Sequence, residues 1–341
     1  MGVGLIGGSV GLAARESGWT VAGVDRPGQL EAALRAGAID QPATLEEVRG
    51  SDVVVLAAPI STVKETLPDL AGSHALITDV ASTKTAIVAA AERAGLRFVG
   101  GHPMAGSQLS GVANARADLF RGARYFLTPT DATDPEDYRE VQSFVRELGA
   151  VPTAVEPEKH DLLMAALSHL PHMMAAALLE VASNISPEAL SFAGPAFRDL
   201  TRVGASNPEL WSDILSENAQ AVGEVLGEFV RTMEDLGGEV EDRERITARF
   251  VEARRAYDSL GGILVEKSGT NVDLAIPVRN RPGVFAEVTT LMGSNSINIL
   301  DLYVRHSNTE RAALVLTLDS DAVKLARELL STAGFASEVV G

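Results

Sequence analysis

The chain opens with three glycines at a fixed spacing, Gly2, Gly4 and Gly7, which fit the pattern G-x-G-x-x-G. Glycines at these positions let a loop turn tightly and let its backbone approach a pyrophosphate at the N-terminus of the next helix. The helical pattern of Ser9–Ser17 supplies that helix. The predicted cofactor-binding residues of this loop are the glycines and the two residues between the last two of them: Gly2, Gly4, Leu5, Ile6 and Gly7.

An acidic residue, Asp25, ends the next predicted strand, 18 residues after Gly7. A carboxylate at that point accepts hydrogen bonds from the adenosine ribose hydroxyls and repels the 2′-phosphate of NADP. Arg26 follows at once and could stack on adenine or tolerate a phosphate. The pair predicts NAD as the cofactor, with NADP as the alternative.

The fingerprint loop should follow a strand, yet only Met1, Gly2 and Val3 are available to form one. In a nucleotide-binding domain of this type that strand is central to the sheet. We therefore expect a gap or a much shortened strand beside the loop. A start codon assigned several residues late, or a trimmed chain, would produce this pattern.

Hydrophobic periodicity divides the chain into three domains and a linker. Residues 1–155 alternate short β-branched runs with Ala-rich helical stretches, which predicts a parallel, doubly wound α/β domain of the Rossmann type. Residues 156–261 have almost no strand signal and read as an all-helical domain. A linker at 262–271 leads to residues 272–341, whose βαββαβ order predicts a small ferredoxin-like α+β domain.

The charge balance and the absence of cysteine exclude several classes of function. The chain has 29 basic and 46 acidic residues, a net charge of −17, which repels nucleic acid. It has no cysteine, which rules out disulfides and thiolate metal sites and suits a reducing cytoplasm. We expect no metal site, no signal peptide and no membrane span. The uncharged segment Leu162–Leu179, interrupted by His169, Pro171 and His172, is interpreted as a buried core helix.

The segment Gly100–Ser107, G-G-H-P-M-A-G-S, carries the strongest chemical signal. Its His102 follows a strand whose C-terminal end faces the cofactor, and an imidazole there is suited to act as a base near neutral pH. Asp79–Lys84 follows the preceding strand and could bring the Ser82 hydroxyl beside His102. Ser168-His169-Leu170-Pro171-His172 places two histidines on one helical face.

These motifs, followed by Phe197–Arg202, occur in the order typical of prephenate and arogenate dehydrogenases, and the chain resembles that family from Gly2 to about Leu260. The resemblance implies NAD-dependent oxidative decarboxylation of prephenate to 4-hydroxyphenylpyruvate, on the way to tyrosine, by a homodimer. It implies that His102 is the catalytic histidine, with Ser82 hydrogen-bonded nearby. It also implies four residues at the substrate site: His169, His172, Arg202, whose planar fork would bind a substrate carboxylate, and Gln108. Gln108 stands where many relatives have a glutamate, so the charge there is lost.

Three alternatives stay open from the sequence. The nearest one keeps the fold and changes the substrate to arogenate, which bears an amine where prephenate bears a ketone. Another β-hydroxyacid or imine reductase is disfavoured by the pairing of the His102 motif with the His169–His172 motif. A non-enzymatic amino-acid-binding regulator is disfavoured by the retained glycine fingerprint and by Arg202.

The last domain resembles an ACT domain, on the residues Arg279–Val284 and Ile297–Ile299. The resemblance implies that Asn280, Gly283 and Asn298 contact an effector amino acid. Tyrosine, the end product of the pathway, is the expected effector.

Overall fold

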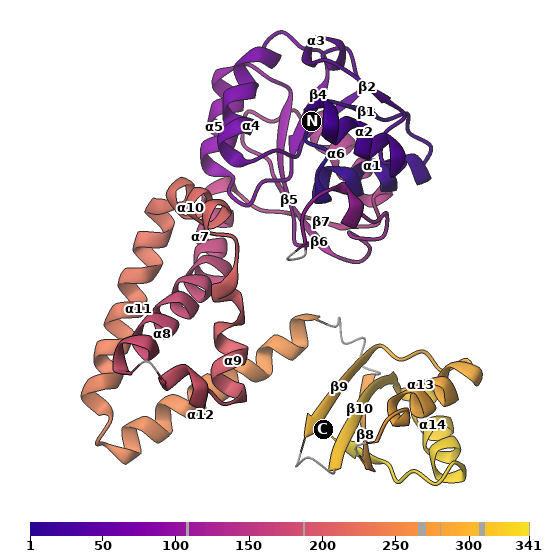
Figure 1. Cartoon of the computed structure of the whole chain (residues 1–341), viewed down its shortest axis with the longest axis vertical. Helices are drawn as coiled ribbons and strands as arrows, with labels where there is room; N and C mark the ends of the chain where they lie inside the picture. The colour runs from indigo at the N-terminus through magenta and orange to yellow at the C-terminus, as the bar shows by residue number, and fades with distance from the viewer. Residues whose placement is uncertain (107–108, 187, 265–270, 280, 307–310, 341) are drawn as a thin grey trace. The chain divides into compact units, whose positions relative to one another are not determined.

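The computed structural model describes the whole chain except residues 107–108, 187, 265–270, 280, 307–310 and 341. It forms two compact units, Met1–Asp235 and Leu236–Gly341 (Figure 1). The first unit contains an α/β part followed by helices. The second contains a long helix and a small sheet with two helices.

A five-stranded mixed sheet forms the centre of the α/β part, in the order β3-β4-β5-β6-β7. Strands β3, β4 and β5 are parallel, β6 runs antiparallel to β5, and β7 is parallel to β6. The prediction of a parallel sheet is therefore wrong for the β5–β6 pair. The strands are β3 (Val53–Leu56), β4 (Leu76–Asp79), β5 (Phe98–Pro103), β6 (Arg124–Thr128) and β7 (Val151–Ala154).

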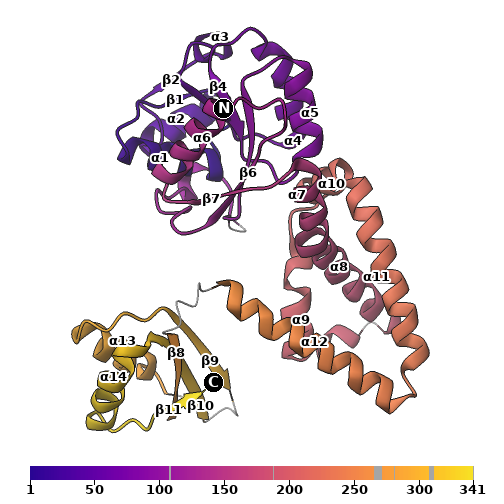
Figure 2. The ribbon, with the colours of Figure 1, turned by 180° about the vertical axis from the view of Figure 1, so that it is seen from behind.

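Helices cover both faces of this sheet, as a doubly wound fold requires (Figure 2). The neighbouring residues Leu76 and Ile77 on β4 are fully buried and point to opposite faces. Ile77 packs in a cluster with residues of α4 and α5, and Leu76 packs with residues of α1 and α6. The helices of this part are α1 (Leu5–Glu16), α2 (Pro27–Arg35), α3 (Leu45–Val48), α4 (Ile60–Thr66), α5 (Thr85–Arg93) and α6 (Pro135–Glu147).

The expected gap in the sheet is present beside the glycine loop. Strands β1 (Ala22–Gly23) and β2 (Gln41–Pro42) form a separate parallel pair. Between β1 and β3 only the first residues of the chain bridge the two edges: the Met1 nitrogen donates to Val55 O at 2.7 Å, and Gly2 N donates to Val24 O at 2.9 Å. A cavity of about 210 Å³ lies there, lined by residues of β1, β3, α1 and α6 or their flanking loops.

The rest of the first unit is helical, as predicted. A π turn, Ala165–His169, joins α7 to α8. Pro171 has no N–H to donate to the preceding turn and its ring would clash with the carbonyl four residues back, so the wider turn relieves both problems. The helices are α7 (Pro157–Met164), α8 (Leu170–Ile185), α9 (Pro195–Thr201), α10 (Pro208–Glu217) and α11 (Ala219–Glu239).

Helix α8 is not the buried core helix expected from its sequence. Among its described residues only Ala175 is buried, while Val181 and Ile185 are 58% and 77% exposed. Pro157–Ile185 is long and apolar enough to cross a membrane by length and composition, and only 22% of its most apolar window is buried. Within the described chain, this helix therefore presents an apolar surface that no other segment covers.

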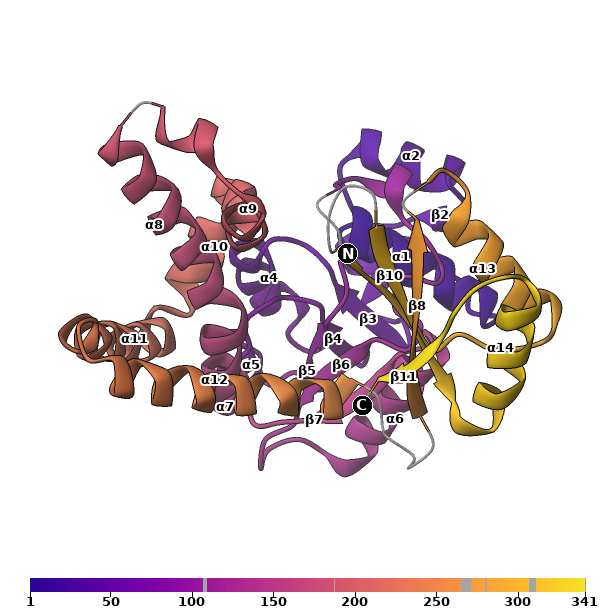
Figure 3. The same ribbon diagram turned by 90° about the horizontal axis from the view of Figure 1, so that it is seen from below.

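The second unit contains α12 (Arg243–Leu264) and the predicted βαββαβ domain. Its four strands are all antiparallel in the order β11-β8-β10-β9, the ferredoxin-like arrangement. Helices α13 and α14 lie on one side of this sheet and close its core (Figure 3). Helix α12 extends to Leu264, into the first residues of the range predicted as a linker. The other elements are β8 (Asn271–Arg279), α13 (Val284–Ser294), β9 (Asp301–His306), β10 (Arg311–Asp319), α14 (Ser320–Thr332) and β11 (Glu338–Val340).

Candidate active site

The glycine loop has the geometry that a bound pyrophosphate requires. Gly2 has φ +79°, and a Cβ there would lie 2.4 Å from Ala57 O. A Cβ on Gly7 would lie 1.8 Å from Gly2 O, so α1 can approach the loop only with glycine there. A Cβ on Gly4 would meet nothing within 4 Å. Since α1 begins at Leu5 with no side-chain cap and no acidic residue in its first turn, the N–H groups of that turn are suited to bind an anion.

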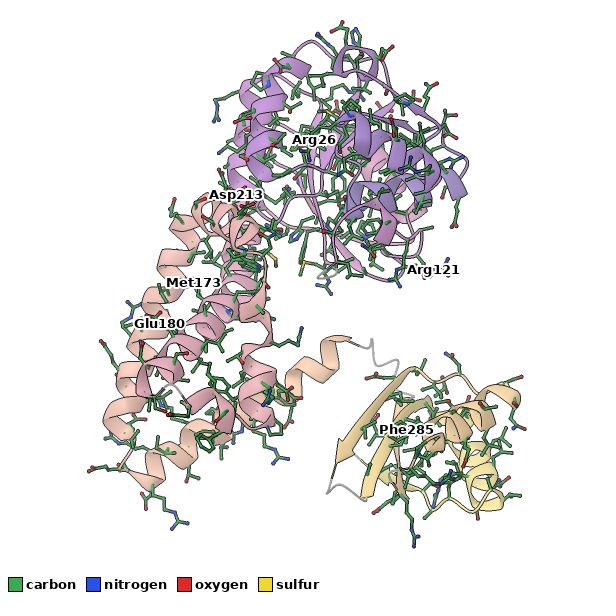
Figure 4. All side chains as sticks on the ribbon, viewed as in Figure 1. Arg26, Arg121, Met173, Glu180, Asp213 and Phe285 are labelled. Atoms are coloured by element: carbon green, nitrogen blue, oxygen red, sulfur yellow. The ribbon has the colours of Figure 1, made fainter. Side chains whose placement is uncertain are left out.

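The carboxylate of Asp25 is joined to the same loop. Its Oδ2 accepts a hydrogen bond from Val3 N at 2.8 Å, and its Oδ1 accepts one from Arg26 N at 2.7 Å. Arg26, labelled in Figure 4, is exposed at the start of α2. The predicted cofactor residues therefore form one continuous site at the end of β1, and the residues present fit NAD.

A buried ion pair braces the strand that carries His102. The carboxylate of Asp79 forms an ion pair with Lys84 Nζ, and both side chains are completely buried. Each also binds the backbone of Gly101: Asp79 Oδ1 accepts from its N–H at 3.0 Å, and Lys84 Nζ donates to its carbonyl at 2.7 Å. A Cβ on Gly101 would lie 2.5 Å from Asp79 O, so glycine is required for this approach. Two motifs of the sequence thus fix one position of β5.

His102 lies within β5, opposite Phe126 of β6, and not in the loop after the strand. Its Nδ1 is 2.9 Å from Nε2 of His160 on α7. The other ring nitrogen of His160, Nδ1, is 2.9 Å from Oδ1 of Asp161. His160 is fully buried, whereas His102 is partly exposed. The arrangement is a chain of carboxylate, buried imidazole and accessible imidazole.

Burial lowers the pKa of His102 well below the usual value of about 6.5 for histidine, and the neighbouring His160, Lys84 and His169 lower it further. His102 is therefore neutral at neutral pH and able to accept a proton. Burial also lowers the pKa of His160, against the opposing hydrogen bond to Asp161. This electrostatic environment keeps both imidazoles in the neutral form, which has a lone pair available to accept a proton.

The two histidines of the π turn and α8 both contact one indole, that of Trp211 on α10. The ring of His172 stacks on Trp211 at 3.6 Å, and the ring of His169 meets it edge-on at 5.9 Å. His169 Nδ1 lies 3.1 Å from the amide nitrogen of Asn218, which fixes Nδ1 as the acceptor and leaves the hydrogen on Nε2. Burial lowers the pKa of His169 to about 4. His169 is therefore neutral, and it is buried, only 1% exposed to solvent.

The remaining predicted site residues are Ser82, Arg202 and Gln108. Ser82 follows β4 and is partly buried, and within the described chain it makes no hydrogen bond to His102. Arg202 is exposed and has no hydrogen-bond or ion-pair partner among the described residues. It begins a short helical turn, Arg202–Ala205, that packs on α8. Gln108 lies outside the described residues.

Sequence reasoning missed three polar or aromatic residues of this site: His160, Asp161 and Trp211. It named the motif Asp79–Lys84 for its Ser82 and assigned no role to Asp79 or Lys84. The signal for His160 and Asp161 is the dipeptide at the start of α7, directly after the last strand of the sheet. A lone histidine at such a place is usually structural, and only the fold brings it to His102.

Family models match most of the chain. Residues 10–153 match the nucleotide-binding domain of prephenate dehydrogenase, and residues 156–253 match its dimerization domain. The chain belongs to the prephenate dehydrogenase family. It is an NAD-dependent oxidoreductase. The prediction of family, enzyme class and cofactor is confirmed.

Known relatives agree with the family models. The prephenate dehydrogenase of Bacillus subtilis is 34% identical over 323 residues, covering 89% of this chain and 86% of the relative. The prephenate dehydrogenase of Aquifex aeolicus, solved with hydroxyphenyl propionate and NAD⁺, is 32% identical with a TM-score of 0.72 and covers 76% of this chain and 96% of its own. The arogenate dehydrogenase of Synechocystis is also 32% identical, with a TM-score of 0.68, and covers 75% of this chain and 98% of its own.

Proposed function

We propose that this chain oxidises and decarboxylates prephenate to 4-hydroxyphenylpyruvate, with His102 as the base. The observation that carries the proposal is the neutral, partly exposed imidazole of His102, braced at the end of β5 in the domain that holds the NAD loop. A base in that position reaches a substrate that also reaches the nicotinamide.

The residues account for the proton movements of this reaction. NAD supplies the acceptor for the hydride that leaves C4 of prephenate. His102 Nε2 takes the proton of the C4 hydroxyl as that hydride departs. Loss of the C1 carboxylate as carbon dioxide returns its bonding electrons to the ring, which becomes aromatic. The phenolate oxygen then recovers the proton from His102, so the histidine ends the cycle neutral.

Binding and orientation fall to the helical part. His172 and Trp211 form a flat stacked wall, and the buried ring of His169 supports it by meeting Trp211 edge-on. Arg202 supplies the planar cation for a substrate carboxylate. In a protein of net charge −17, an arginine with no acidic partner in the described part of the chain is the kind of group that holds a dianion.

The function is tested by crossing two substrates with two cofactors. We expect reduction of NAD with prephenate to be the preferred combination, because Asp25 disfavours the 2′-phosphate of NADP. Formation of the reduced cofactor is followed at 340 nm, and the keto-acid product is identified by mass. The second candidate, arogenate, is favoured by the likeness to the Synechocystis enzyme. Faster turnover of arogenate would assign that substrate instead.

A homodimer is part of the proposal. Apolar residues on the described helical segments are exposed to water in the single chain and would be stabilised by burial. The family model that matches residues 156–253 is that of a dimerization domain. A second copy of the chain can bury these apolar residues without a membrane. We place the protein in the cytoplasm, in line with its lack of cysteine.

The C-terminal domain is proposed to be an ACT domain that binds tyrosine. Its ferredoxin-like strand order supports this, and so does the loop that opens α13, where Gly283 has φ +87°. That loop borders a hollow lined by Arg281, Pro282, Gly283, Phe285 and Ala286. Free N–H groups at the start of α13 suit an amino-acid carboxylate. Asn298 is exposed just before β9, and Asn280 lies outside the described residues.

Replacing Gly283 with Val is expected to weaken inhibition by tyrosine about tenfold or more, while turnover without tyrosine stays close to the unmodified rate. Valine at φ +87° strains the loop and fills part of the hollow. The matched control is Gly334→Val, which introduces the same backbone strain at φ +84° after α14. Inhibition curves at several prephenate concentrations provide the measurement. Unchanged inhibition that competes with prephenate would place tyrosine at the catalytic site.

A further inference from the structure

We propose that His160 is a positioning residue: together with Asp161 it holds His102 as the neutral tautomer that carries its hydrogen on Nδ1 and a free lone pair on Nε2. The proposal rests on the role of His102 as the base. It assigns a role to a buried histidine that does not itself face the substrate.

Asp161 can act only as an acceptor. Its Oδ1 accepts from Lys84 N at 2.7 Å and its Oδ2 accepts from Thr85 N at 2.8 Å, at the first turn of α5. Burial would raise its pKa, but the hydrogen bonds from His160 and these N–H groups lower it below the usual value. The carboxyl is therefore ionised, and the nitrogen that faces it, His160 Nδ1, must carry a hydrogen.

The hydrogen on His160 Nδ1 determines which ring donates in the hydrogen bond between His160 and His102. A neutral imidazole with its hydrogen on Nδ1 has only a lone pair on Nε2. His160 Nε2 is therefore an acceptor, and the group 2.9 Å away, Nδ1 of His102, must donate to it. His102 is left with a lone pair on Nε2, the nitrogen that can reach a substrate. A free imidazole would populate both neutral tautomers, only one of which has its lone pair there.

Packing prevents His160 from turning out of this chain. Its ring is fully buried, 5.4 Å edge-on from Phe126 and 5.1 Å from His102. Its backbone N–H donates to Glu156 O at 2.8 Å. The carbonyl of Asp161 accepts from the amide of Asn218 at 2.8 Å, and the same amide holds His169. One rigid network thus orients the base and a neighbouring imidazole.

The same chain keeps its direction when Nε2 of His102 takes up a proton, because Nδ1 of His102 still donates to His160. The charge that arises on His102 faces His160 and, beyond it, the only carboxylate in line with the ring among the described residues, Asp161. The other charged or titratable groups around the pair come from three elements: Asp79 of β4, Lys84 before α5 and His169 of the π turn. Lys84 and His169 oppose a proton on His102, as His160 itself does, which keeps the resting imidazole neutral. Asp161 acts on His102 through His160, by fixing the hydrogen on His160 Nδ1.

Two substitutions separate positioning from folding. His160→Leu removes the acceptor and is expected to lower kcat with prephenate about 10- to 100-fold while KM for prephenate and NAD stays within about twofold. His160→Gln keeps an oxygen that can accept from His102 Nδ1 and should restore most of kcat. His74→Gln, at an exposed histidine distant in the chain, is the matched control. Equal loss in the Leu and Gln variants, or no loss in either, would overturn the proposal.

A direct reading of the tautomer does not depend on activity. The chain has six histidines, so ring-nitrogen correlation spectra of ¹⁵N-labelled protein can be assigned, with His102→Asn identifying the signal of interest. We expect hydrogen on Nδ1 of His102 in the unmodified protein and in His160→Gln, and a mixture of tautomers in His160→Leu. Hydrogen on Nε2 of His102 in the unmodified protein would refute the inference. If the tautomer is as expected but prephenate is not turned over, the proposed function fails and the positioning role stands.

Discussion

Replacing His102 with Asn is expected to lower kcat with prephenate by about 10²–10⁴-fold, the usual contribution of a general base. Asparagine can still donate to His160 from its amide, so β5 should keep its place. It has no lone pair able to take the hydroxyl proton. Cofactor binding should be nearly unchanged, because the glycine loop and Asp25 belong to other elements. Initial rates and NAD titration by fluorescence measure the two quantities separately.

The pH dependence of kcat/KM provides a second test of His102 as the base. The reaction requires neutral His102, so kcat/KM should fall as the pH is lowered through the pKa of this group. Burial and the neighbouring His160 and Lys84 place that pKa well below the usual histidine value of about 6.5. The acid limb should therefore lie below 6.5, and the rate should be level from there to neutral pH. In His102→Asn this limb should disappear.

His74→Gln serves as the control for His102 as well, because His74 is exposed and belongs to the same α/β part. A His102→Asn variant that kept near-normal turnover, or kept the acid limb of the unmodified protein, would show that another group takes the proton. His160, the nearest imidazole, would then be the first alternative, although its full burial makes direct contact with substrate difficult.

Much of the fold could be predicted from local patterns. The strands of the α/β part coincide with short β-branched runs such as Val53–Leu56, whose side chains must be buried on both faces. The order of strands and helices in the second unit was also predictable. Apolar residues alternate along a strand and recur every three or four positions along a helix, so the two kinds of element can be told apart in the sequence. The gap beside the glycine loop followed from counting residues before Gly2.

Features set by pairing between distant segments could not be predicted. The alternating pattern of β6 does not record its direction, which is antiparallel to β5. The strand β5 continues through His102 because Gly100 and Gly101 fit against β4 and β6, whereas glycine and proline in isolation favour a loop. The apolar sequence of α8 was interpreted as core, but an apolar helix in an oligomer can be exposed in a single chain.

The sequence predicted only those residues of the candidate site whose chemical type falls within a distinctive motif. His102, the glycine loop and the His169–His172 pair are recognisable because their residue types and spacing are distinctive. His160 and Asp161 are not, since a histidine and an aspartate at the start of a helix are ordinary surface residues in most sequences. Their role comes from α7 folding back against β5 and β6, a contact between residues 58 positions apart.

Replacing Arg202 with Gln is expected to raise KM for prephenate about 10- to 100-fold, with a much smaller effect on KM for NAD. A hydrogen bond between a guanidinium and a carboxylate contributes about 1.5–3 kcal/mol, which corresponds to this range. Arg202 is exposed and has no hydrogen-bond or ion-pair partner among the described residues, so its replacement breaks neither kind of interaction there. The loss should therefore appear in substrate binding and not in thermal stability.

The matched control for Arg202 is Arg198→Gln, which removes the same charge one helical turn earlier. Arg198 already donates to the carbonyl of Ala193 at 3.2 Å, at the start of α9. If net charge alone attracted the dianionic substrate, both variants would raise KM equally and added salt would abolish the difference. If Arg202 binds the carboxylate directly, only its loss should matter at high salt, because a close ion pair is screened less than a distant charge. Arg202→Lys should recover only part of the affinity, since an ammonium cannot make the two parallel hydrogen bonds of a guanidinium. The opposite pattern, with KM raised by Arg198→Gln and unchanged by Arg202→Gln, would assign the carboxylate to Arg198.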